Sequence, residues 1–301
     1  MTTIQQIHWE LEMDYIGHPY YVSGNAIIHA LGHHLPDEHL DHLQASHGIF
    51  VPGQFGTYPD DHSQTGARPC MGSTLHPVET YEDLFLFRNP SQSWLLESRP
   101  RDALNTHAIR TQGGHMGFSH EMKMGRPTDA YHDYETTTWY LSAYVHADHP
   151  EYLPLSEDAL DGLQFGGKRN YGYGTTKLKE TQCIDVDDID YSRLRQADTH
   201  LLVLTTPLVL DSTHPAADSW TIPAWWAEDR SDLREREEQI RLDKSTHQLQ
   251  TVDHGQVVEY TCDQPVGTAK NGIRRIGSHS KYGFGELQLI PVDSETESVE
   301  K

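Results

Sequence analysis

A nine-residue pattern rich in glycine and aromatic residues occurs twice in this chain. The first copy, GGKRNYGYG, runs from Gly166 to Gly174, and the second, GSHSKYGFG, runs from Gly277 to Gly285. Three glycines and two aromatic residues recur at a constant offset of 111 residues, and each copy leads into an alternating strand pattern. A long match at one offset predicts two copies of one structural unit, and therefore two domains.

Helix and strand patterns along the first half of the chain predict an α+β domain. Alternation at 7–17 and 136–147 indicates strands, and helical spacing begins near Ser23 or Asn25 as the N-cap. Residues 81–88 also resemble a strand, and residues 106–124 resemble a hairpin that turns at Gly113 and Gly114. Ser156 is expected to cap a short helix that leads into the first glycine pattern.

The second half begins after a polar, acidic connector at 181–198. We therefore expect an N-terminal domain at 1–198, which carries an insertion, and a C-terminal domain at 199–292. In the second domain, 200–210 is predicted to be a strand. Residues 228–244 are predicted to be a solvated helix, because opposite charges lie at helical spacing. The acidic residues 293–301 are expected to form a disordered tail.

Charge is the strongest compositional feature of the chain. There are 45 acidic and 23 basic residues, a net charge of −22, and only eight lysines. A dispersed acidic excess of this kind is typical of salt-in halophiles and predicts a haloarchaeal source. In roughly molar salt the screening length falls to about 3 Å, so the net charge does not exclude nucleic acid as a partner.

Compartment and cofactor chemistry follow from what the sequence lacks. It has no signal-peptide pattern at its start and no run of about 18 apolar residues, so we expect a cytoplasmic protein without a membrane partner. The three cysteines form no CxxC pair. We expect neither a cofactor nor a metal. The 21 histidines are densest at 33–47 but lack strict ligand spacing, which favours a solvated face over a metal site.

The glycine patterns have two possible roles. Glycine is favoured where φ is positive or where the backbone lies against a ligand. Backbone amides there would cradle a phosphate, while Lys168 and Arg169 neutralise it and Tyr171 or Tyr173 stacks on a base. The other interpretation is a tight turn whose aromatic side chains belong to the core. Neither copy fits a Walker loop or a dinucleotide fingerprint.

These segments resemble the RAMP superfamily of CRISPR-associated proteins. The resemblance rests on a helix, a glycine loop and a strand that occur twice, with support from YYVSGNAIIHAL, TTTWYLSAYV and LLVLTTPLVL. In this order, with an insertion in the first domain, the chain is most similar to the group-five effector subunits, including their type III counterparts. The resemblance implies two tandem ferredoxin-like (RRM-type) domains. It also implies a non-catalytic subunit that holds the crRNA 5′ handle beside backbone and large effector subunits.

The resemblance implies RNA contacts in both glycine loops. The candidates in the first loop are Gly166, Gly167, Lys168, Arg169, Tyr171, Gly172 and Gly174. In the second loop, Ser278, His279 and Ser280 replace Gly167, Lys168 and Arg169. Its candidates are therefore Arg274, Arg275, Gly277, Lys281, Gly283 and Gly285. The first loop is the stronger candidate because it keeps the Lys-Arg pair.

Two alternatives stay open. RAMP endonucleases that process crRNA often place a general-base histidine near the first helix, which would make His29 a catalytic residue in metal-independent cleavage. His29 would otherwise cover the helix edge. The second alternative is an RRM-like structural or interaction protein unrelated to CRISPR.

Overall fold

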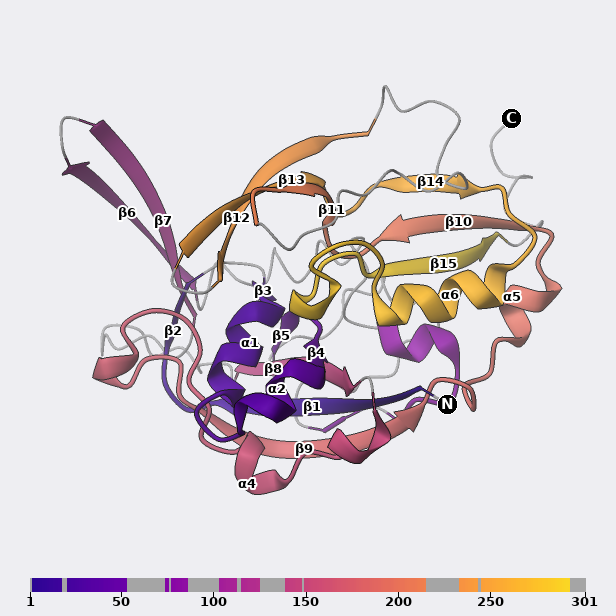
Figure 1. The fold of residues 1–301 in the computed structure, drawn as a ribbon, viewed down its shortest axis with the longest axis horizontal. Coiled ribbons are helices and arrows are strands. Elements are labelled where there is room, and N and C mark those ends of the chain that lie inside the picture. The colour runs from indigo at the N-terminus through magenta and orange to yellow at the C-terminus, as the bar shows by residue number, and fades with distance from the viewer. Residues whose placement is uncertain are drawn as a thin grey trace, which may run out of the picture. The chain divides into compact units, whose positions relative to one another are not determined.

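The computed structural model describes residues 2–17, 21–52, 74–75, 77–85, 103–112, 115–124, 139–147, 149–214, 233–242 and 245–292. In this part of the chain the fold is α+β, built from antiparallel strand pairs and short helices (Figure 1). The chain forms two compact units. The N-terminal unit comprises the described residues of 2–77 and 92–184. The C-terminal unit comprises 78–85 and the described residues from 185 onward.

A six-stranded sheet organises the N-terminal unit. Its strand order is β3-β5-β8-β1-β9, and β4 pairs with β8 beside this path. β1 and β8 pair antiparallel from Ile4 opposite His146 to Glu10 opposite Tyr140. The strands are β1 (Thr3–Leu11), β3 (Tyr21–Val22), β4 (Leu43–Ala45), β5 (Gly48–Pro52), β8 (Trp139–Ala147) and β9 (Thr176–Asp185).

Two of the short helices in this unit begin at serine caps. The Ser23 hydroxyl accepts the Ala26 N–H at 3.2 Å, so Ser23 is the cap of the first helix, and the Ser156 hydroxyl accepts the Ala159 N–H at 3.4 Å. Both capped starts agree with the sequence prediction. The helices are α1 (Gly24–Leu31), α2 (Asp37–His42) and α4 (Glu157–Leu160), with a 3₁₀ turn η4 (Pro150–Tyr152).

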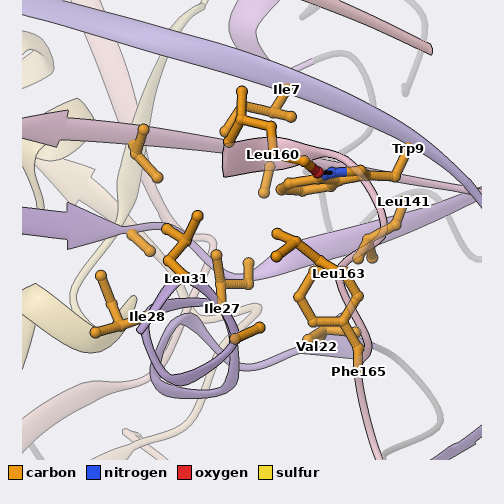
Figure 2. Packing of buried hydrophobic residues seen from close by; sticks show 14 of the residues in the cluster. Ile7, Trp9, Val22, Ile27, Ile28, Leu31, Leu141, Leu160, Leu163 and Phe165 are labelled. Carbon is orange, nitrogen blue, oxygen red and sulfur yellow. Dashed lines mark hydrogen bonds between the residues drawn. The ribbon is translucent and has the colours of Figure 1, made fainter. Parts of the chain in front are cut away.

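The core of this unit lies between its sheet and the helices α1 and α4 (Figure 2). Ile27 and Leu31 of α1 are fully buried against Ile7 and Trp9 of β1. The Trp9 indole N–H donates to the Leu160 carbonyl oxygen at 2.7 Å, which satisfies a buried polar group. The same core therefore fixes the chain where it enters the first glycine loop.

A hairpin forms a separate three-stranded sheet with the order β2-β7-β6. β6 (Ala103–Gln112) and β7 (His115–Met124) pair antiparallel over their full length, and β7 also pairs with β2 (Tyr15–Gly17). The hairpin predicted at 106–124 is confirmed. Its predicted turn at Gly113 and Gly114 lies outside the described residues.

The C-terminal unit contains two three-stranded sheets, β14-β10-β15 and β11-β13-β12. The helix α6 precedes β15 and approaches it closely, because a Cβ added at Gly272 would lie 2.3 Å from the Leu287 carbonyl oxygen. The elements are α5 (Ser192–Gln196), β10 (Thr199–Leu204), β11 (Leu208–Ser212), β12 (Glu235–Leu242), β13 (Ser245–Val252), β14 (Val257–Tyr260), α6 (Pro265–Arg274) and β15 (Leu287–Val292).

The predicted helix at 228–244 is wrong where the structure describes it. Residues 235–242 form strand β12, which pairs with β13 at every position. Ile240 and Leu242 are buried two positions apart, which is the period of a strand. Pairing with β13 and burial of this face outweigh the helical propensity of a sequence rich in Glu, Arg and Gln.

Two predicted strands also differ from the structure. Residues 81–85 form a 3₁₀ turn, η2 (Tyr81–Phe85), because the Asp83 carboxylate accepts the Thr80 N–H at 2.8 Å and the Glu79 N–H at 3.1 Å. The predicted strand at 200–210 is two strands, β10 and β11, which join different sheets. The predicted tail, 293–301, lies outside the described residues.

Candidate nucleic-acid interface

The first glycine loop folds around a single 3₁₀ turn, η5 (Arg169–Tyr171). Lys168 before the turn and Gly172 after it both have left-handed backbone conformations. Inside the turn, the Tyr171 N–H donates to the Lys168 carbonyl oxygen and the Gly172 N–H donates to that of Arg169, each at 2.9 Å. The local sequence therefore places three consecutive side chains on a compact projecting turn.

Hydrogen bonds to the backbone of β2 and of the residue before it fix this loop. The Gly174 N–H donates to the Asp14 carbonyl oxygen at 2.8 Å, and the Gly167 N–H donates to that of Ile16 at 2.7 Å. At Gly174, where φ is +71°, an added Cβ would lie 1.8 Å from the Phe165 carbonyl oxygen. Only glycine fits at this closure.

The second glycine loop repeats this backbone. His279 is left-handed, η7 (Ser280–Tyr282) forms the 3₁₀ turn, and Gly283 is again left-handed. The Gly285 N–H donates to the Pro207 carbonyl oxygen at 2.8 Å. A Cβ at Gly285 would lie 1.8 Å from the Ile276 carbonyl oxygen, the counterpart of the Phe165 contact. Corresponding residues in sequence thus occupy corresponding backbone conformations.

Both loops lie in segments without acidic residues. Neither 162–179 nor 264–285 contains any of the chain's 45 Asp and Glu residues, and each contains four Lys and Arg residues. A polyanion that approached either segment would meet less like-charge repulsion from the local sequence than elsewhere on a chain of net charge −22.

Side chains of the first loop face solvent. Lys168 and Arg169 are exposed, and Tyr171 has 73% of its surface accessible. By contrast, the backbone N–H groups of Gly167, Tyr171, Gly172 and Gly174 are bonded within the protein. The expectation that the loop amides cradle a phosphate therefore does not apply to these four, and the side chains provide the contact surface.

The second loop is more closely packed. Arg275 is 5% exposed, and its Nε donates to the Ser280 carbonyl oxygen at 2.8 Å, so its side chain supports the loop from within. Arg274 is exposed, and Lys281 is half-buried. Tyr282, the counterpart of Tyr171, packs against a buried cluster that includes Val209 and Phe284. Of the basic candidates here, Arg274 is the one most open to solvent.

Three histidines meet at the second loop, which sequence patterns did not indicate. The His214 ring centroid lies 4.7 Å from that of His247 and 6.1 Å from that of His279. Burial, together with His214 and His247, lowers the pKa of His279 to about 4. The three residues are far apart in sequence, so the only available signal was the replacement of Lys168 by His279.

His29 lies on the exposed side of α1, in its last turn. Its ring packs edge-on against His33 at 5.6 Å between centroids. The sequence had grouped 33–47 as one histidine-rich segment, but the structure separates its members. His42 stacks on Tyr152 at 4.5 Å, whereas His47 is buried.

His47 instead supports the start of α1, where its Nδ1 accepts the Gly24 N–H at 3.0 Å. Across the described ranges, no group of three or more His, Cys, Asp or Glu side chains is arranged to hold a metal ion. In the same ranges, no helix is long and apolar enough to cross a membrane.

No family model matches the chain, and no curated protein matches its sequence. Among solved structures, it is similar to a chain in the cryo-EM structure of the Type III-B Cmr-beta bound to cognate target RNA. The two are 12% identical with a TM-score of 0.34, over 95% of this chain and 96% of that chain. A likeness at this level carries no functional argument.

Proposed function

We propose that the chain is a non-catalytic crRNA-binding subunit of a CRISPR effector ribonucleoprotein. The first glycine loop carries this proposal, because it presents Lys168, Arg169 and Tyr171 to solvent on a backbone fixed by Asp14 and Ile16. Exposed cations neutralise phosphates, and an exposed aromatic ring stacks on an unpaired base. A preorganised loop lowers the entropy lost on binding. The proposed ligand is the 5′ handle of the crRNA.

The strand order supports a ferredoxin-like (RRM-type) first domain. In the path β5-β8-β1-β9, α1 lies in sequence between β1 and β5, and α4 lies between β8 and β9. This matches a βαββαβ unit whose last strand lies beside its first. In the second domain, β14-β10-β15 with α6 before β15 supports a related arrangement. We therefore propose tandem domains of this type at 1–198 and 199–292.

The partners in this proposal are crRNA and the backbone and large subunits of the effector complex. The insertion in the first domain caps the neighbouring backbone subunit. For a protein from a haloarchaeal cytoplasm, the net charge of −22 is compatible with RNA. In roughly molar salt, screening acts over about 3 Å, so close contacts determine affinity. Counterion release weakens under these conditions, which leaves stacking and hydrogen bonds as the main contributions.

The test is a double substitution, Lys168→Ala with Arg169→Ala, in the assembled complex at its native salt concentration. Loss of two charge-assisted contacts predicts a fall in crRNA affinity on the order of tenfold or more. Arg193→Ala with Arg195→Ala on α5 removes the same charge outside both loops and serves as the matched control. Unchanged crRNA binding in the first variant contradicts the proposal.

The endoribonuclease alternative makes a different prediction for the same preparation. It requires metal-independent cleavage of repeat RNA that His29→Ala abolishes, because the imidazole would be the general base. Such cleavage would replace the non-catalytic role with a catalytic one. RNA sequencing of the copurified complex reports the bound RNA directly, and absence of crRNA would favour an RRM-like protein outside CRISPR.

A further inference from the structure

The histidine cluster at the second glycine loop comes from three separate segments. His214 follows β11, His247 lies in β13, and His279 directly precedes the 3₁₀ turn of the loop. The ring centroids are 4.7 Å apart for His214 and His247, and 6.1 Å apart for His214 and His279. Folding of the C-terminal unit is therefore what brings these imidazoles together.

The surroundings of His279 contain hydroxyl groups and aromatic rings. Its Nε2 lies 3.4 Å from the Ser212 hydroxyl and its Nδ1 lies 3.1 Å from the Ser278 hydroxyl. The rings of Tyr282 and Phe284 pack beside it. In the described part of the chain, the titratable groups that act on the His279 pKa are His214 and His247, and no carboxylate is among them.

Because no carboxylate among the described residues acts on the His279 imidazole, this cluster favours an anionic ligand. Protonation of His279 is opposed by burial and by the His214 and His247 rings, which lower its pKa. A bound anion reverses that balance because it stabilises the imidazolium form. The geometry of the three histidines does not support a metal site, since the described residues contain no group of three ligands placed to hold a metal ion.

His279 also stands at the position of Lys168. Both residues are left-handed and precede a 3₁₀ turn between corresponding glycines. The first loop therefore has a permanent cation at this position, whereas the second has a group whose charge depends on pH and on its ligand.

We propose that His214, His247 and His279 form a proton-linked site for a tetrahedral oxyanion, namely a phosphate of the RNA backbone. This inference rests on the proposed function, and it assigns the RNA contact that the second loop makes. Hydroxyls of Ser212 and Ser278 act as further donors, while imidazolium charge grows as phosphate binds. By linkage, affinity for the anion rises as pH falls, and binding takes up protons.

The experiment measures binding of a short single-stranded RNA to the full chain by fluorescence anisotropy, from about pH 8 to about pH 5.5. The dye is one that does not titrate in this range, and phosphodiesters keep their charge throughout. Wild-type affinity should rise by up to about tenfold per pH unit for each proton taken up. His279→Ala should flatten the dependence of RNA affinity on pH. His279→Lys should restore the affinity but not its pH dependence.

Controls separate this site from the first loop and from unfolding. His33→Gln changes an exposed histidine of the other unit and should leave the pH dependence unchanged. Lys168→Ala with Arg169→Ala should lower affinity equally at every pH, so failure of the proposed function and failure of this site give different results. Circular dichroism establishes that each variant is folded. His247→Gln removes a second imidazole of the cluster and should also reduce the pH dependence of RNA affinity.

Sulfate provides the second arm because it is a tetrahedral oxyanion that does not titrate in this range. Competition by sulfate, lost in His279→Ala, identifies a site for free oxyanions as well as RNA. A His279-dependent pH effect with RNA alone identifies a site that requires the polymer. Either result supports the proposal. A wild-type affinity that does not vary with pH, or a variation that His279→Ala leaves intact, overturns it.

Discussion

Lys168 and His279 have nearly the same left-handed backbone conformation, with φ and ψ of 55° and 31° in one and 65° and 14° in the other. Each precedes a 3₁₀ turn in a glycine loop, in two different compact units. The backbone of the repeat has thus been kept while the side chain has changed from a permanent cation to a titratable one. The two loops therefore share a shape but differ in charge.

Glycine at the closure of the first loop should be far more sensitive to substitution than glycine at its tip. Gly174→Ala would place Cβ 1.8 Å from the Phe165 carbonyl oxygen, whereas Cβ at Gly172 meets no atom within 4 Å. We expect Gly174→Ala to lower the free energy of unfolding by about 3 kcal/mol or more. Gly172→Ala should cost about 1 kcal/mol, for its positive φ alone. Chemical denaturation followed by circular dichroism measures both, and equal effects would contradict the geometry.

Substitutions at the adjacent residues Arg274 and Arg275, before the second loop, should have different effects on stability and on RNA binding. Arg275 is buried and donates to the Ser280 carbonyl oxygen, so Arg275→Ala should lower the free energy of unfolding by about 1.5–3 kcal/mol. Arg274 is exposed, and Arg274→Ala should leave the free energy of unfolding within about 0.5 kcal/mol while weakening RNA binding. Denaturation and RNA titration of both variants check this. The reverse assignment would remove Arg274 from the candidate interface.

Tyr81 should stabilise the C-terminal unit through its hydroxyl group. The side chain is fully buried, and its oxygen accepts the Leu289 N–H of β15 at 3.0 Å. Tyr81→Phe leaves that buried N–H without its acceptor, which should cost about 1–3 kcal/mol. The exposed Tyr171→Phe makes the same chemical change and should have no measurable effect on the free energy of unfolding. A neutral Tyr81→Phe would show that another acceptor replaces the hydroxyl.

Acid should destabilise the C-terminal unit through His279. Its pKa falls from an ordinary 6.5 to about 4 in the folded state, so the unfolded chain binds more protons between these values. The stabilisation is complete above pH 6.5 and is lost as pH falls toward 4. Without RNA, the denaturation midpoint should fall less between pH 7.5 and pH 5 in His279→Gln than in wild type. His33→Gln should behave like wild type, and identical pH dependence in all three would contradict the lowered pKa.

Local features of the fold were accessible from sequence. Ser23 and Ser156 cap helices because each hydroxyl reaches an N–H three residues ahead, and that contact needs no other part of the chain. The left-handed glycines of both loops likewise follow from residues a few positions apart. The basic and aromatic residues of the first loop could likewise be identified from the sequence alone.

Contacts between distant segments determined the features that sequence patterns did not predict. Residues 235–242 have the composition of a helix, yet pairing with β13 and burial of Ile240 and Leu242 make them a strand. Arg275 has the charge of an RNA contact, but its burial turns it toward Ser280. His214, His247 and His279 acquire a shared environment only because the C-terminal unit folds.

The sequence by itself indicated where the backbone of the two glycine loops would adopt positive φ, since steric limits on φ act within a few residues. Tertiary structure decided which side chains of each loop face solvent, because burial depends on segments far away along the chain. That is why Tyr171 projects from its loop while Tyr282, at the corresponding position, packs into a core.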